Sequence, residues 1–179
     1  MVEQGRWARF TPVVEGYESS IHEVPRGGFC LSVFLLLNAR DRPSRILIGR
    51  PNPGANWERL AGYRRAGVSD EEWLLPASIL RFAESPDDAA QRIIDEQLAG
   101  IQILLSGPQV ESEVYSPRGR VEWKNHWDLR FLYTGALAAA PPTGSVWAEL
   151  ALLDPTAPGS KMLGRGQGDI LRSKASVSR

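Results

Sequence analysis

An almost continuous apolar run extends from Phe29 to Leu37 and is rich in residues that favour β-structure. Such a run predicts a central strand that is buried on both faces. Residues 38–44 are polar and include Pro43, which predicts a turn. The apolar residues 46–48 follow, and we expect them to form the antiparallel hairpin partner of the central strand.

The stretch that begins at Ser85 carries the clearest helix signal in the chain. Ser85 suits the N-cap, Pro86 suits the first helical position, and Asp88 lies three residues after the cap, as in a capping box. Apolar residues then recur at helical spacing, and Gly100 fits the end of the helix. We therefore expect a helix from Pro86 to near Gly100.

The remaining elements have weaker signals. Residues 147–153 fit either a strand or a helix, and residues 50–72 read as a long loop. The other expected elements are strands near 10–14, over 101–105, over 110–115 and over 128–137, and a short helix over 168–174. Strands around one strong helix predict an α/β (α+β) sandwich around one mixed sheet.

Length and composition exclude several classes of protein. A chain of 179 residues with 42% hydrophobic residues fits one folded domain and excludes a disordered chain. The 21 Lys and Arg residues balance the 21 Asp and Glu residues, so the bulk charge disfavours nucleic acid as a partner, although a local basic patch stays open. No apolar run reaches the ~20 residues that span a bilayer, and the first residues lack the apolar segment of a secretory signal. We expect a cytoplasmic protein without a membrane partner.

Charge is uneven along the predicted helix. Residues 84–100 hold five carboxylates and only Arg92 as a cation, a net charge of 1 − 5 = −4. Two interpretations fit this pattern. It is either a solvated helix face or a site for a divalent metal, because hard cations prefer several carboxylate oxygens.

The order of residues in this segment resembles the Nudix box, whose pattern is G-x5-E-x7-R-E-U-x-E-E-x-G-U with U an aliphatic residue. Over residues 78–100, Glu84 matches the first glutamate, Arg92 the arginine, Ile94 the aliphatic position and Glu96 the first of the paired glutamates. The resemblance implies that Glu84 and Arg92 form an ion pair that ties the box loop to its helix.

The resemblance also implies a fold and domain limits. We expect a Nudix-type α/β/α sandwich around a mixed β-sheet over residues 29–174. Residues 1–28 would then form an N-terminal extension and residues 175–179 a C-terminal tail.

Five of the nine specified box positions depart from the family pattern. Two of them are Ala99 and Gly100, which stand where a glycine and an aliphatic residue are expected, although Gly100 and Ile101 restore that pair if one residue is inserted.

In the other three departures, Ser78 replaces the first glycine, Ile93 the glutamate after the arginine, and Gln97 the second of the paired glutamates. In the family, the glutamates at positions 93, 96 and 97 face one side of the helix and hold Mg²⁺. Here Glu96 keeps a carboxylate and Gln97 offers only a neutral carbonyl oxygen. The resemblance therefore implies that Glu96 is the catalytic and metal-ligating residue, with Gln97 as a second ligand and Mg²⁺ or Mn²⁺ weakly bound if at all.

Other residues are candidates for completing the site. Loop carboxylates at Glu122, Asp128 or Glu149 would compensate for the missing ligands if they approach the helix. For the substrate, Trp57 and Trp123 lie among polar residues and would stack on a nucleotide base.

Arg59 belongs to the same long loop as Trp57, and it would contact phosphates. For the two tryptophans ordinary packing is the alternative, and for Arg59 a solvated loop charge.

Two functions stay open at this point. The first is an enzyme that binds a nucleoside diphosphate derivative, or a similar phosphorylated small molecule, and hydrolyses its diphosphate linkage with a divalent metal. The second is a catalytically weak or inactive Nudix module that binds a nucleotide or RNA, or that acts as a protein-interaction domain. Homodimers are common in the family, so the resemblance leaves a homodimer open, with the N-terminal extension as a candidate for its interface. Ile93 and Gln97 favour the second function because both replace metal-ligating glutamates.

Overall fold

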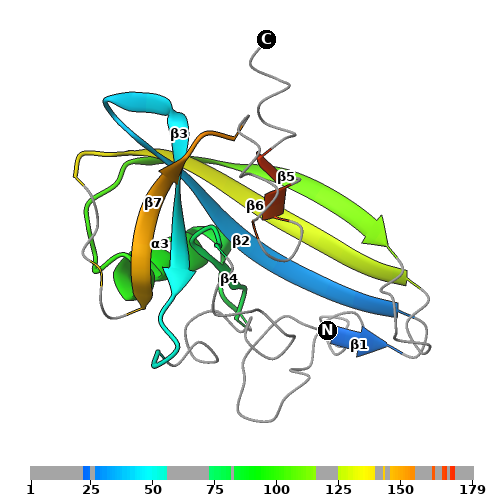
Figure 1. Ribbon diagram of the computed structural model, residues 1–179. Helices are drawn as coiled ribbons and strands as arrows, with labels where there is room; N and C mark the ends of the chain where they lie inside the picture. The colour runs from blue at the N-terminus through cyan, green and yellow to red at the C-terminus, as the bar shows by residue number, and fades with distance from the viewer. Residues whose placement is uncertain are drawn as a thin grey trace.

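The computed structural model of the chain is shown in Figure 1. It describes residues 22–24, 27–55, 73–81, 83–115, 125–139, 143, 146–155, 163, 167–168 and 170–171. The elements within these residues are the strands β1 (His22–Val24), β2 (Gly27–Ala39), β3 (Arg42–Pro51), β4 (Ala77–Ile79), β5 (Leu105–Tyr115), β6 (Asn125–Leu137) and β7 (Trp147–Leu153), and the helix α3 (Pro86–Gln97). None of the described helices is long and apolar enough to cross a membrane.

The described strands form one mixed sheet in the order β5-β6-β2-β3-β7. The central strand β2 pairs with β6 in parallel along its whole length, from Gly27 opposite Asn125 to Ala39 opposite Leu137. Its other edge is shared by three antiparallel partners: β1 near its start, β4 in its middle and β3 at its end. The mixed sheet and helix α3 confirm the expected α+β class.

Strands β2 and β3 pair only next to their hairpin, and residues 73–81 lie between them farther along. Figure 1 shows β2 and β3 diverging from the hairpin, with β4 near the opening. Leu74 exchanges two backbone hydrogen bonds of 2.8 Å with Gly49 of β3, and the Leu35 N–H of β2 donates to the Pro76 carbonyl at 2.9 Å. The segment just before the box is thus held from both sides by backbone bonds.

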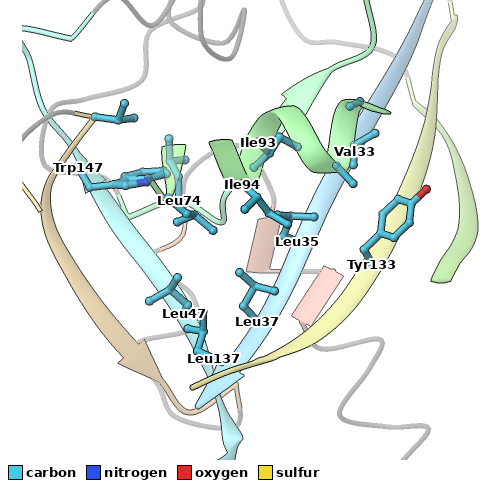
Figure 2. Packing of buried hydrophobic residues seen from close by; sticks show 14 of the residues in the cluster. Val33, Leu35, Leu37, Leu47, Leu74, Ile93, Ile94, Tyr133, Leu137 and Trp147 are labelled. Carbon is cyan, nitrogen blue, oxygen red and sulfur yellow. The ribbon is translucent and has the colours of Figure 1, made fainter. Parts of the chain in front are cut away.

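Alternate side chains of β2 enter two cores on opposite faces of the sheet, as the period of two along a strand requires. Val33, Leu35 and Leu37 belong to the first core together with the buried face of α3. Figure 2 shows the helix residues Ile93 and Ile94 among the side chains of this core.

Phe34 and Leu36 belong to the second core, where they pack with Ile170 and Leu171. Those two residues are helical. Helical residues therefore cover both faces of the sheet, as in the predicted sandwich.

The predicted strand at 29–37, its partner at 46–48 and the strand at 128–137 are confirmed, and β2, β3 and β6 are longer than predicted. The predicted turn at 38–44 is shorter, because β3 already begins at Arg42. Residues 147–153 are a strand. The predicted strand near 10–14, most of the loop at 50–72 and part of the segment 168–174 lie outside the described residues, and the predicted domain limits stay a prediction.

The predicted strand over 101–105 is wrong. Residues 101–104 join no strand, and one strand, β5, covers 105–115. Ile101 and Ile103 pack against the first core beside α3, whereas Leu104 is exposed. Ile101 and Ile103 are apolar because they contact the core, and they do not pair in the sheet.

Candidate functional site

The start of helix α3 is fixed by its own sequence. The Ser85 hydroxyl oxygen accepts a hydrogen bond from the Asp88 N–H at 3.1 Å, and the hydroxyl donates to the Asp88 carboxylate at 2.7 Å. Pro86 occupies the first turn, where its missing N–H costs no helical hydrogen bond. The predicted N-cap at Ser85 is therefore present, and Asp88 contacts the cap through the Ser85 hydroxyl group.

The first turn of α3 is also tied to the sheet. The Tyr133 hydroxyl of β6 donates a hydrogen bond to the Asp87 carboxylate. Burial, this hydrogen bond and the negative charge of Asp87 all raise the pKa of Tyr133 above its ordinary value. The phenol therefore stays protonated and keeps the helix start on the sheet.

Glu84 and Arg92 form a two-pronged ion pair across the box. Arg92 Nε lies 2.6 Å from Glu84 Oε1, and Arg92 Nη2 lies 2.8 Å from Glu84 Oε2. The guanidinium also donates to the Ser78 hydroxyl at 2.9 Å and to the Ile79 carbonyl at 3.1 Å. Arg92 thereby connects the helix to both ends of the loop that precedes it.

The same contacts shift the titration of Glu84. Burial alone would raise its pKa, but the hydrogen bond from Arg92, the backbone N–H of Arg81 and the charges of both arginines lower it overall. Glu84 is therefore ionised at neutral pH and acts as the anionic half of a structural link.

Ile93, at a position where the family has a metal-ligating glutamate, is fully buried in the first core. Its side chain packs with apolar residues of the sheet and provides no atom that binds a cation.

Gln97 is buried as well, with 2% of its surface exposed. Its amide oxygen accepts a hydrogen bond from the Ala77 N–H at 3.3 Å, and its amide nitrogen donates to the Ala77 carbonyl at 2.7 Å. This amide pairs with a backbone segment in the way that a neighbouring strand would. Gln97 therefore joins α3 to β4.

Glu96 lies on the same helix and is partly buried, with 26% of its side chain exposed. Its Oε1 atom is 3.4 Å from Nη2 of Arg81, and its Oε2 atom is 3.8 Å from Nη1 of Arg92. Oε2 is buried, and none of the described residues donates a hydrogen bond to it. The carboxylate is thus placed between two guanidinium groups.

These residues do not fit a divalent cation. Mg²⁺ requires several oxygen ligands in near-octahedral geometry, and carboxylates supply the charge that offsets its desolvation. Position 93 supplies no oxygen, and the amide oxygen of Gln97 is buried and accepts from the Ala77 N–H. The Glu96 carboxylate lies next to two guanidinium groups, which disfavours a further cation there. Among the described residues there is no group of three or more His, Cys, Asp or Glu side chains that could hold a metal.

The carboxylates expected to compensate do not change this result. Glu149 forms an ion pair with Arg50 at 3.1 Å, at the pairing of β7 with β3. Asp95, a further carboxylate of the helix that was not among those expected to compensate, accepts a hydrogen bond from Gln91 at 2.9 Å on the exposed side of α3. Glu122 and the side chain of Asp128 lie outside the described part of the chain.

The predicted substrate contacts Trp57, Arg59 and Trp123 also lie outside the described residues, so their roles stay predictions. Sequence reasoning missed Arg81. It occupies the five-residue spacer of the box, where the family pattern specifies no residue type. Its position three residues before Glu84 is the sequence feature that indicates its role. A short turn between the two residues would bring Arg81 close to the start of the helix. The Arg81 N–H does donate to the Glu84 carboxylate at 2.8 Å.

No protein-family model matches the chain, and none of the curated proteins matches it. Solved structures do match. A MutT protein from Methanosarcina mazei Go1 superposes with a TM-score of 0.61 at 13% identity, over 88% of this chain and 99% of that one. The dihydroneopterin triphosphate pyrophosphohydrolase of E. coli gives a TM-score of 0.55 at 14% identity, over 83% and 96%. A NUDIX hydrolase from Nitrosomonas europaea gives 0.53 at 16% identity, over 83% and 89%. The chain therefore has the Nudix fold.

Proposed function

We propose that this chain binds the diphosphate group of a nucleoside diphosphate derivative, or of a similar phosphorylated metabolite, and hydrolyses it far more slowly than a protein with a complete Nudix box. The Nudix fold supports the ligand class, because similar structures are named as hydrolases, one of them as a triphosphate pyrophosphohydrolase. The weak hydrolysis follows from the residues of α3.

One observation carries the proposal. The three helix positions that bind metal in the family make other contacts here. Ile93 packs in the core, and the Gln97 amide bonds to the backbone of Ala77. Glu96 pairs with arginine side chains. Hydrolysis of a diphosphate requires positive charge on the phosphate oxygens and an activated water, which a divalent metal supplies in this family. Such an ion would find one carboxylate here, and that carboxylate already has cationic partners.

The box scaffold is nevertheless retained. Arg92 still binds Glu84 and the β4 residues Ser78 and Ile79. The segment that leads into β4 is held between β2 and β3. A retained scaffold with altered ligand positions fits a binding protein better than an enzyme. RNA binding and homodimerisation stay predictions from the resemblance of the sequence.

The experiment is a hydrolysis screen on the full chain with Mg²⁺ and with Mn²⁺, over nucleoside triphosphates, ADP-ribose, dinucleoside polyphosphates and NADH. Glu96→Gln is the paired control, because it removes the charge and keeps the shape. We expect equally low turnover in both proteins, far below that of a protein with a complete Nudix box. Turnover in the wild type that disappears in Glu96→Gln would show an enzyme whose metal site is completed by other residues.

Binding is measured on the same compounds by calorimetry. We expect at least one compound with a diphosphate linkage to bind, and a nucleoside without phosphate to bind more weakly. If none of the compounds binds, with or without metal, the proposed ligand class is wrong.

A further inference from the structure

We propose that the outer edge of strand β7 is an interface with a second copy of this chain, in which the two β7 strands pair antiparallel about a two-fold axis. The inference goes beyond the proposed function, because it requires no ligand. It starts from the contrast between the two edge strands of the sheet.

The described strands leave the sheet with two edges, β5 at one end and β7 at the other (Figure 1). An open edge pairs readily with another strand, and proteins protect such edges with proline, bulges or charges. Strand β5 has all three kinds of protection. Pro108 lies within it, at the place where its pairing with β6 shifts register. Glu111 and Glu113 follow toward its end.

Strand β7 has little of this protection. Its seven residues, Trp147–Leu153, include no proline, no glycine and no lysine, and six of the seven are apolar. The charged residue, Glu149, is already paired with Arg50 of β3 at 3.1 Å. Among the residues that the structure describes, only β3 pairs with β7. Such an edge is a template for pairing with another chain.

The backbone of β7 directs polar groups to this edge. The Gly49 N–H donates to the Leu74 carbonyl at 2.8 Å, and the Gly49 carbonyl accepts from the Leu74 N–H at 2.8 Å. Gly49 therefore uses both groups on the side of β3 that faces away from β7. Because Gly49 lies opposite Leu150, and opposite residues of an antiparallel ladder exchange both hydrogen bonds or neither, the N–H and carbonyl of Leu150 point away from β3. Those of Leu152 do the same, because the direction alternates along a strand.

These directions select the register of two paired β7 strands. The residues whose polar groups point outward lie opposite each other, so Leu150 of one copy exchanges both hydrogen bonds with Leu152 of the other. Setting Leu150 opposite itself would instead bring Leu152 to Ala148, where the register of β7 with β3 is interrupted. The axis then passes between the two copies of Ala151. They form a pair without hydrogen bonds, about 4.5 Å apart at Cα, where a small side chain fits.

Charge and packing favour a second copy in this place. In this register Glu149 lies opposite Leu153 of the other copy, so like charges do not face each other. Leu150 and Leu152 pack against the first core on one face of the sheet. Pairing continues that apolar row across the axis, because the same two leucines follow in the second copy. A two-fold pair is also the commonest assembly, since one surface serves both partners.

The test is the mass of the full chain in solution, measured by sedimentation velocity from about 1 to 200 μM. This range brackets the micromolar dissociation constant that we expect of a small interface. Ala151→Lys places two positive charges opposite each other at the axis, which destabilises the pairing. Val110→Lys is the matched control, because Val110 lies on the other edge strand and is 53% exposed. Circular dichroism and thermal unfolding verify that each variant is folded.

We expect wild type and Val110→Lys to form dimers with dissociation constants within about twofold of each other, and Ala151→Lys to dimerise about tenfold more weakly or less. Equal dimerisation of the two lysine variants would overturn the inference. A wild type that stays monomeric at the highest concentration would overturn it too, and would leave the edge of β7 to a different chain.

A disulfide variant decides the matter if Ala151→Lys does not fold. Ala151→Cys is a small change, and a Cα separation of about 4.5 Å lies within the range of about 4.4–6.8 Å that disulfides span. Mild oxidation should give a dimer that is joined through residue 151 of both copies, whereas Val110→Cys should give no link through residue 110. Peptide mass mapping separates these links from any through Cys30, which every variant contains. A folded, dimeric Ala151→Cys without the link would place the interface elsewhere and overturn the inference.

Discussion

The side-chain amide of Gln97 pairs with both backbone polar groups of Ala77, accepting from the N–H at 3.3 Å and donating to the carbonyl at 2.7 Å. A buried backbone segment needs a partner for each of these groups, and here one side chain satisfies both. A glutamate at this position would keep the acceptor but lose the donor. Gln97, one of the residues that distinguish this chain from the family pattern, therefore also holds its helix to its sheet.

The first prediction concerns Gln97→Glu. The introduced carboxylate would face the Ala77 carbonyl oxygen in a buried place, so we expect the free energy of unfolding at pH 7 to fall by about 1–3 kcal/mol. Burial raises the pKa of an introduced carboxyl, and its protonated form regains an O–H donor. The loss in free energy of unfolding relative to wild type should therefore decrease as the pH falls toward about 5. Urea denaturation at several pH values measures this loss.

Gln91→Glu is the control for this change, because Gln91 is exposed on the same helix and its amide donates to Asp95. It should cost no more than about 0.5 kcal/mol, the size of an exposed like-charge pair. Equal losses in the two variants would contradict the structural role of Gln97.

The second prediction concerns Ile93→Glu, which places a carboxyl in the first core. We expect this variant to lose more than about 3 kcal/mol or to be unfolded, because a buried charge without a partner is among the most costly substitutions. Ile93→Val is the volume control and should lose only about 0.5–1.5 kcal/mol. Thermal and denaturant unfolding compare the two.

Restoring both family glutamates, Ile93→Glu with Gln97→Glu, should consequently yield a poorly folded protein and not an active one. A stable double variant that gains metal-dependent hydrolysis would show instead that the helix face adapts readily to a metal, and that Ile93 is not required by the core.

The third prediction follows from the lowered pKa of Glu84. A carboxyl whose pKa is lower in the folded than in the unfolded state stabilises the fold at pH values above its unfolded pKa of about 4.5. That contribution is lost as the pH falls through the folded value. The stability difference between wild type and Glu84→Gln should thus be constant near neutral pH and decrease below about pH 4.5.

Denaturant titrations of both proteins from neutral to acid pH measure this difference. Asp41→Asn is the control, because Asp41 is exposed and its pair with Arg42 is a long 3.7 Å contact. Its stability difference should stay near zero throughout. A difference for Glu84→Gln that does not change with pH would exclude the ion pair as its cause.

The fourth prediction concerns Gly49, which lies against the ring of the buried Trp147. A Cβ atom at residue 49 would come within 2.3 Å of a ring carbon, so Gly49→Ala requires the ring or strand β3 to move. We expect a loss of about 1–3 kcal/mol from overpacking. At Gly54 the nearest described atom to an added Cβ is in the Asn52 side chain at 3.5 Å, and Gly54→Ala should be close to neutral. If both variants unfold at the same temperature, the contact with Trp147 is not rigid.

Elements whose signals are local were predictable from the sequence. The start of α3 was recognisable because Ser85, Pro86 and Asp88 act on the backbone within one turn. The strand β2 was recognisable because both of its faces are buried, which requires an almost continuous apolar run. The segment 101–105 was misread because apolar residues that pack beside a helix look the same in sequence as those of a strand.

The candidate site depended on contacts that the sequence does not contain. The spacing of residues 93, 96 and 97 places them on one side of a helix, and the sequence showed which two of the three had changed. Only the tertiary structure assigned their different neighbours. The core surrounds Ile93, the backbone of β4 faces Gln97, and Arg81 reaches Glu96.

The sequence by itself thus determined the box scaffold, the helix that carries it and the loss of two acidic side chains, because these depend on residue types at short spacing. The tertiary structure decided what replaced the acids. The neighbours of an α3 side chain come from strands and loops distant along the chain, and their distances follow from how β2 and β3 separate to admit residues 73–81. The replacement of a metal face by a buried isoleucine, an amide pair and an arginine bridge is therefore a property of the packing.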